Sequence, residues 1–161
     1  MPDADQFTLL NANMKFVMFI KASEFFNPKI SGTDQLKLML HGAFDREHQL
    51  PYLPALVSPL TKVFSQFPKF HPVNQSFESL QNLDMDKTTM YLAVLISLFA
   101  EPDGLSKEGG KMVSNTQKQL RRMLYRYFCS SMDPMHAQMK LELIEIIINL
   151  LISYEDYLIQ I

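Results

Sequence analysis

Cysteine is almost absent from this sequence, which has only Cys129 among its 161 residues. A single cysteine excludes an internal disulfide and any zinc site built from several thiolates, and it is typical of a reducing compartment. Glycine is also scarce, and the sequence has no G-x-G-x-x-G, no P-loop and no G-x-S-x-G. The four histidines are scattered without metal-ligand spacing. The sequence therefore predicts no enzyme, no catalytic residue, no metal and no cofactor.

Long apolar runs and an excess of charge are missing as well. No apolar run reaches the length of about 18 residues that a membrane-spanning helix needs. The formal net charge of −2 implies no broad positive field for nucleic acid. We therefore expect no membrane and no direct nucleic-acid contact. Apolar residues make up 47% of the chain, which argues against disorder and favours one folded domain over residues 1–161.

What is present indicates a mostly helical chain. Asp3 and Ser106 are suited to cap helices, and Pro134 is suited to a first helical turn. Five of the nine prolines fall within residues 51–72, which argues against long helices there. Asn27-Pro28 and an alternation of leucines up to residue 40 favour a small hairpin over residues 27–42. Helices are predicted over residues 5–26, 55–67, 73–82, 85–100, 108–130 and 134–158.

Two of these helices are apolar on nearly every side. Between Met14 and Ile20 only Lys15 is polar, and between Met90 and Ala100 only Ser97 is strongly polar. A helix that covers a core from outside has one polar face, so a helix without one needs neighbours on several sides. The pattern predicts a middle layer between two outer helical layers. The second run rises only about 16 Å, too little to cross a bilayer.

Two stretches resemble a known family. The stretch DMDKTTMYLAVLISLFAEPDGLS resembles the eighth helix of nuclear receptor ligand-binding domains and the turn after it, and it is most similar there to retinoid X receptors. The stretch DADQFTLLNANMKFVMFIKASEFF resembles the signature of the family's fourth and fifth helices, with Asp5-Gln6 followed by Leu9-Leu10. The order and spacing of the two stretches extend this resemblance over nearly the whole chain.

The resemblance implies an all-α, three-layer helical sandwich with a small β-hairpin. It begins at the family's fourth helix and ends within what resembles the tenth and eleventh. It therefore implies a truncated domain without the first helices, the activation helix and the DNA-binding domain. The family binds lipophilic ligands, recruits coregulators and dimerises in the nucleus to regulate transcription. We expect the same here, or alternatively a ligand-independent interaction and dimerisation module without DNA binding.

The resemblance also selects candidate site residues. Gln6 and Asn11 fall at coregulator-facing positions, although the family commonly has a cation where Asn11 stands. Phe25 falls where retinoid receptors hold an acid-binding arginine, so any ligand is expected to be neutral, because a buried carboxylate would lack a partner. The alternative is that these apolar residues simply fill the core. The candidate ligand-binding residues are Met14, Met18, Phe25, Leu38 and Leu40.

The last predicted helix is rich in isoleucine and leucine, in the region that forms much of the family's dimer interface. Its apolar residues recur at three- and four-residue spacing, and Leu143, Ile146 and Leu150 widen the stripe beyond one layer of neighbours. Basic residues on the preceding helix would form the rim of a dimer or face an acidic partner; alternatively they are solvated or pair with Glu142 and Glu145. The partner is expected to be another receptor subunit, with Ile144, Ile147, Ile148, Leu151 and Arg122 at the interface.

Overall fold

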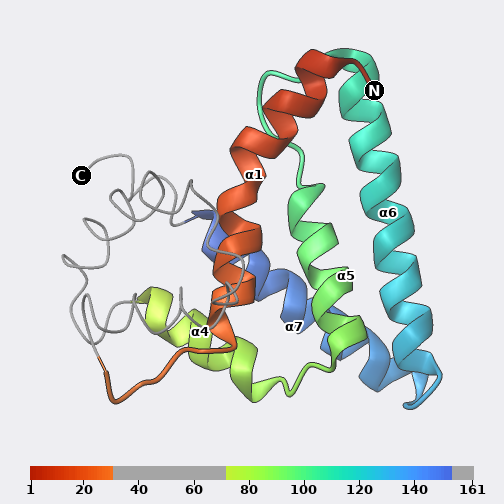
Figure 1. Ribbon diagram of the computed structural model, residues 1–161. Helices are drawn as coiled ribbons and strands as arrows, with labels where there is room; N and C mark the ends of the chain where they lie inside the picture. The colour runs from red at the N-terminus through yellow and green to blue at the C-terminus, as the bar shows by residue number, and fades with distance from the viewer. Residues whose placement is uncertain (31–71, 154–161) are drawn as a thin grey trace.

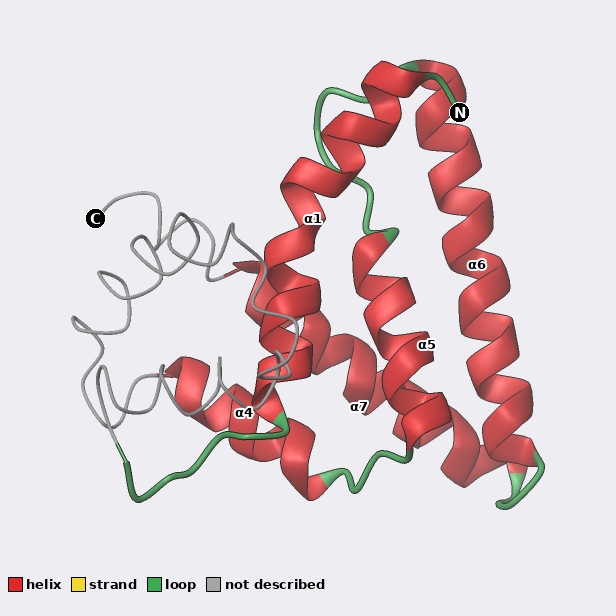
Figure 2. Cartoon of the chain, in the orientation of Figure 1, coloured by secondary structure: helices red, strands yellow, loops and turns green. Residues whose placement is uncertain are grey.

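In the part of the chain described by the computed structural model, residues 1–30 and 72–153, helices are joined by turns and loops and are the only regular secondary structure (Figures 1 and 2). Its α-helices are α1 (Asp3–Ser23), α4 (Pro72–Asn82), α5 (Lys87–Leu98), α6 (Lys107–Cys129) and α7 (Pro134–Ser153). The all-α class is therefore confirmed for this part of the chain, which contains no strand. The predicted helix over residues 55–67 lies outside the described residues.

Helices α5, α6 and α7 each begin just after a residue whose side chain accepts from a backbone N–H of the first turn. The Ser106 hydroxyl accepts from Gly109 N at 3.0 Å at the start of α6, as predicted. Asp86 Oδ1 accepts from Thr89 N at 2.8 Å at the start of α5. Pro134 occupies the first position of α7, and Asp133 Oδ1 before it accepts from Met135 N at 3.1 Å.

The hairpin predicted over residues 27–42 lies outside the described residues except for its first four. Residues 27–30 form a turn rather than a strand. Lys29 N donates to Asn27 Oδ1 at 3.0 Å, and Ile30 N donates to the Asn27 carbonyl at 3.1 Å. This is the turn that the Asn27-Pro28 pair predicts, because asparagine side chains bond to the backbone two residues ahead.

Helix α5 lies between α1 and α6, and α7 passes behind them (Figure 1). The most extensive helix contact joins α1 to α5, and α4 packs against both α1 and α7. On α5, Tyr91 is 59% exposed and Leu95 is 38% exposed. Helix α5, which is predicted to be apolar on nearly every side, is therefore covered by α1 and α6, while the side that carries Tyr91 and Leu95 faces solvent.

The core forms where α1, α4, α5, α6 and α7 meet. Phe26, just after α1, packs its ring against Phe77 of α4, with 5.5 Å between the ring centroids. Burial of a side chain of this size stabilises the folded state by about 1.5–3 kcal/mol. The most completely buried apolar side chains of the cluster are Ile20, Phe77, Ala93, Leu124, Ala137 and Ile144.

Candidate functional site

A buried carboxylate joins the two stretches that carry the family resemblance. Asp5 near the start of α1 is 4% exposed. Its Oδ1 accepts from Ser106 N at 2.9 Å, and its Oδ2 accepts from the Ser106 hydroxyl at 2.5 Å. Ser106 is itself the N-cap of α6. One carboxylate therefore fixes the start of α6 against the start of α1.

The surroundings of Asp5 account for its ionisation. The hydroxyl and the backbone N–H of Ser106 both donate to the carboxylate, and together they lower the pKa of Asp5 below its ordinary value. Gly109 lies against the same carboxylate, and a Cβ at that position would lie 2.6 Å from Asp5 Cγ. Glycine is therefore required there by the close approach of the Asp5 carboxylate.

A second polar link lies about two helical turns further along α1. Asn13 is buried, and its Nδ2 donates to the carbonyls of Leu98 at 2.9 Å and Ala100 at 2.6 Å. Leu98 is the last residue of α5 and Ala100 lies just after it, and the last C=O groups of a helix have no partner within it. Asn13 therefore closes the end of α5 against α1.

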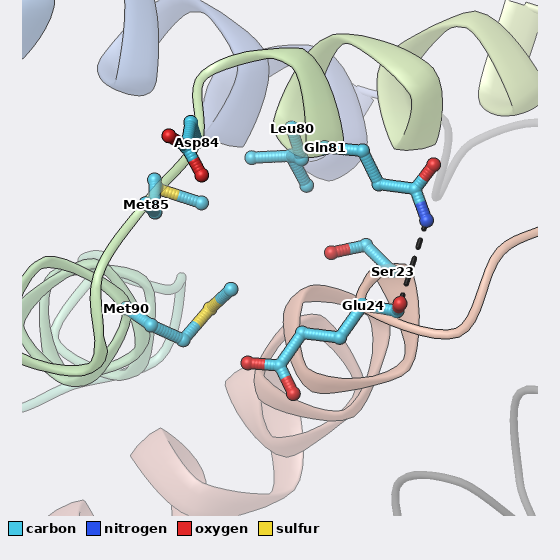
Figure 3. Close-up of a pocket in the computed structure, with 7 residues that line it drawn as sticks. All are labelled: Ser23, Glu24, Leu80, Gln81, Asp84, Met85 and Met90. Atoms are coloured by element: carbon cyan, nitrogen blue, oxygen red, sulfur yellow. Dashed lines mark hydrogen bonds between the residues drawn. The ribbon is translucent and has the colours of Figure 1, made fainter.

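A pocket of about 390 Å³ opens between the end of α1, α4 and the start of α5. Figure 3 shows that its lining residues come from all three segments, with Met85 and Met90 on one side and Glu24 on another. Gln81 Nε2 donates to the Phe26 carbonyl at 2.8 Å and thereby holds α4 to the chain after α1. The lining residues are Ser23, Glu24, Leu80, Gln81, Asp84, Met85 and Met90.

The chemistry of this pocket disfavours an anionic ligand. Its lining includes two carboxylates, Glu24 and Asp84, and no cation among the described residues. It is open to solvent rather than enclosed, unlike the cavities that hold lipophilic molecules. It therefore lacks both the cation that a fatty acid needs and the apolar enclosure that a sterol needs.

The residues predicted to bind a ligand do not gather in this pocket. Met14 is 50% exposed on α1, and Phe25 is 37% exposed after its end. Neither lines the pocket, and the neighbouring Phe26 enters the core where Phe25 does not. Met18 belongs to α1, but the structure does not describe its side chain. Leu38 and Leu40 lie outside the described residues. Ligand binding by this set stays a prediction.

The two predicted coregulator positions lie on an exposed part of α1. Gln6 and Asn11 are both exposed, and Gln6 Nε2 donates to the Met1 carbonyl at 2.9 Å. Beside them Phe7, Leu10 and Met14 are 71%, 48% and 50% exposed. Their spacing of three and four residues aligns these three side chains along one side of the helix. We call Phe7, Leu10 and Met14 the α1 stripe.

The residues predicted for a dimer interface fall on two sides of the molecule. Ile144, Ile147 and Ile148 are buried in the chain's own core, at 0%, 6% and 4% exposure. They are therefore occupied within one chain and do not form an exposed seam. Arg122 of α6 is exposed, as expected for a rim residue. The side chain of Leu151 lies outside the described ones.

The opposite side of α7 carries the exposed apolar surface. Leu143 is 47% exposed, Ile146 is 54% and Leu150 is 43%. Met135 and Met139 extend this surface toward the start of the helix, with 65% and 54% exposure. Successive members are separated by four, four, three and four residues, so they share one side of the helix. We call these five residues the α7 stripe.

Sequence reasoning identified part of the α7 stripe but not its two methionines. The sequence pattern marks Leu143, Ile146 and Leu150 as excess apolar surface. Met135 and Met139 were missed because their position before the isoleucine-rich run separates them from it in the sequence. The signal that finds Met139 is the heptad-like 4-3-4 spacing, which continues unbroken from Leu150 back to Met139, and Met135 lies a further four residues before it.

Residues 1–30 and 72–153 contain no group of histidine, cysteine and acidic residues that could hold a metal. Within the same ranges no helix is both long and apolar enough to span a membrane. His136 Nδ1 contacts Asp133 Oδ2 at the start of α7 and, with the backbone N–H of His136, lowers the pKa of Asp133.

No family model, curated protein or solved structure matches this chain. The assignment of function therefore rests on the residues and their geometry.

Proposed function

We propose that this chain is a helical protein-association module that dimerises through the α7 stripe. The observation that carries the proposal is the stripe itself. Five large apolar side chains, 43% to 65% exposed, follow one another along α7 on the side away from the core. Contiguous apolar surface of this kind on a soluble protein marks a contact site.

The pattern of the stripe favours a second copy of the same chain as the partner. Met139, Leu143, Ile146 and Leu150 follow the 4-3-4 spacing of a helix that packs against another helix. One helix face that pairs with its own copy satisfies the two-fold symmetry of the commonest oligomers. The polar residues Glu142 and Asn149, both exposed, border the stripe and would form its rim.

The sequence resemblance supports a more specific proposal. In that proposal the chain is of nuclear receptor ligand-binding type, with the three-layer helical arrangement of that family. It acts in the nucleus on transcription, as a homodimer or with another receptor subunit. The family's lipophilic ligand is the less favoured element, because the described pocket is open and carries two carboxylates. The ligand-independent module is accordingly the form that the pocket among the described residues supports better.

The test compares two leucines of nearly equal exposure on different helices. Leu143→Arg places a charge in the α7 stripe, whereas Leu10→Arg places the same charge in the α1 stripe, where Leu10 is 48% exposed. Sedimentation equilibrium and circular dichroism are measured on the same samples. Leu143→Arg should weaken the dimer at least about tenfold, or about 1.4 kcal/mol, while the helicity stays unchanged.

Leu10→Arg is the matched control and should leave the dimer intact. A dimer that survives Leu143→Arg with undiminished affinity would refute an α7 interface. Equal weakening by both substitutions would show that the association depends on general apolar exposure rather than on α7.

The α1 stripe supports a second function, the binding of a partner helix. Its three apolar side chains have the spacing that recognition of an amphipathic helix uses, and Gln6 and Asn11 lie beside them. A labelled Leu-x-x-Leu-Leu peptide should bind the native chain and lose affinity for Leu10→Arg but not for Leu143→Arg. Fluorescence anisotropy measures both affinities. Equal binding to all three proteins would exclude the α1 stripe as the site.

A further inference from the structure

A row of exposed cations runs along the outer side of α6. We call the following residues the α6 row: Lys107, Lys111, Lys118, Arg122 and Arg126. Because an α-helix turns about 100° and rises about 1.5 Å per residue, the α6 row falls within an arc of about 100° and extends about 28 Å along the axis. Glu108 is the one acidic residue of the α6 sequence, and it lies at the edge of this arc.

The α6 row is not neutralised within the described part of the chain. Glu145 of α7 forms an ion pair with Arg121, which lies outside the row, with 2.6 Å between Arg121 Nε and Glu145 Oε1. Glu142 of α7 instead accepts from Gln138 at 2.7 Å. None of the five row residues forms an ion pair with any described residue. Five like charges along one helix repel one another, and an anionic partner would relieve that repulsion.

Apolar side chains border the row on one side. Met112 is 42% exposed and Met123 is 56% exposed. At about 100° per residue, both lie next to the arc of the α6 row, on the same side of it. Methionine is flexible and polarisable, and it is over-used on surfaces that bind helices of varied sequence. The outer side of α6 therefore presents a cationic band next to an adaptable apolar border.

The row is held rigid by the contacts described above. Ser106 caps the start of α6 and is fixed by the Asp5 carboxylate. Leu120, Leu124 and Phe128 anchor the opposite side of the helix in the core. A binding surface on a rigid helix loses less conformational entropy on association than one on a loop.

We infer that the α6 row binds an acidic amphipathic helix of a partner protein, whose carboxylates face the cations and whose apolar residues cover Met112 and Met123. A membrane surface is less suited, because most of the apolar side of α6 faces the core and only these methionines and part of Tyr127 remain. A long nucleic acid is less suited because the net charge of the chain is −2, and Glu101, Asp103 and Glu108 lie near one end of the row.

The experiment uses a fluorescein-labelled helical peptide of about 20 residues, with glutamates on one face and leucines beside them. A matched peptide carries glutamine in place of every glutamate. Anisotropy titrations with the full chain are run at about 50 mM and about 300 mM salt. The acidic peptide should bind, the glutamine peptide should bind at least about tenfold more weakly, and high salt should weaken binding of the acidic peptide.

Charge reversal then locates the site. Lys118→Glu with Arg122→Glu should lower the affinity for the acidic peptide at least about tenfold. Lys29→Glu with Lys87→Glu changes the net charge equally at exposed positions outside the row and should change the affinity less than about twofold. Lys118→Gln with Arg122→Gln gives a milder version in case the reversal perturbs folding. Circular dichroism verifies the helicity of each variant.

Three results would overturn the inference. The first is equal binding of the acidic and glutamine peptides. The second is an equal loss of affinity in the row variant and the control variant. The third is tighter binding of anionic phosphatidylserine vesicles or of a DNA duplex than of the peptide, with that binding abolished by the row variant. The last result would reassign the surface to a membrane or to nucleic acid.

Discussion

At the scale of single residues, Gly109 and Gly110 form a natural comparison. A Cβ on Gly109 would meet the buried Asp5 carboxyl, whereas a Cβ on Gly110 would lie 2.8 Å from Glu101 Oε1, the end of an exposed and flexible side chain. Gly109→Ala should therefore destabilise the fold by about 1–3 kcal/mol, despite the better helix propensity of alanine. Gly110→Ala should stabilise it by up to about 1 kcal/mol. Urea unfolding followed by circular dichroism measures both, and a stabilising Gly109→Ala would contradict the contact.

The ionisation of Asp5 predicts a particular dependence of stability on pH. Its folded-state pKa is lowered by hydrogen bonds from Ser106, so the unfolded chain binds this proton more tightly. The stabilisation is therefore present above the ordinary carboxyl pKa of about 4 and is lost as the pH falls through the lowered value. Asp5→Asn cannot titrate, so it should lose less stability than the native chain between about pH 5 and pH 2.

Urea midpoints measured across this range provide the comparison between the native chain and Asp5→Asn. The pKa values of Asp86 and Asp133 are lowered as well, but both residues are present in both proteins. Their contributions cancel in the difference between the two curves. Parallel curves would show that the bonds to Ser106 do not stabilise the charged form of Asp5.

At the scale of elements, one aspartate both caps α5 and ties it to α6. Asp86 accepts from Thr89 N at 2.8 Å and from the Tyr127 hydroxyl at 2.5 Å. Asp86→Ala removes both bonds and should cost about 1–2 kcal/mol. Tyr127→Phe removes only the tie to α6, at the surface, and should cost about 0–1 kcal/mol. Asp86→Ser should recover most of the cap. Equal losses in Asp86→Ala and Tyr127→Phe would mean that the cap contributes nothing.

The sequence was most informative about where elements start. Ser106 and Pro134 begin helices because capping and proline preferences act over a few neighbouring residues, and these are visible in the sequence. It was less informative about which side of a helix is inside. Ile144 and Ile146 are chemically identical, yet one is 0% and the other 54% exposed, because α6, α4 and α1 cover only one side of α7. Asn13 shows the same limit, since its partners lie at the end of α5.

At the scale of the whole molecule, the proposed dimer predicts that stability depends on protein concentration. The α7 stripe is exposed in one chain and would be covered in two. Association stabilises the folded state by mass action, so Tm should rise with concentration. Scanning calorimetry over about a hundredfold range measures this, with Leu143→Arg as the control whose Tm should depend less on concentration. A Tm for the native chain that is independent of concentration would contradict the dimer.

Ligand content gives a second test at this scale. Native mass spectrometry after expression in lipid-rich cells should recover no stoichiometric fatty or retinoic acid. The described pocket carries Glu24 and Asp84, and Phe25 supplies no cation where the resemblance would place one. Recovery of such an acid, bound as an anion in a one-to-one complex, would show that an anion site exists elsewhere in the chain.

The contact between Asp5 and Ser106 can form only late in synthesis of the chain. Its two residues are separated by 101 positions. At a translation rate of about 5–20 residues per second, α1 leaves the ribosome about 5–20 s before the serine that its carboxylate binds. Helix α5, with which α1 makes its most extensive contact, also emerges late. During that interval the apolar residues of α1 lack their native cover, so we expect the nascent chain to be prone to aggregation until α5 and Ser106 have emerged.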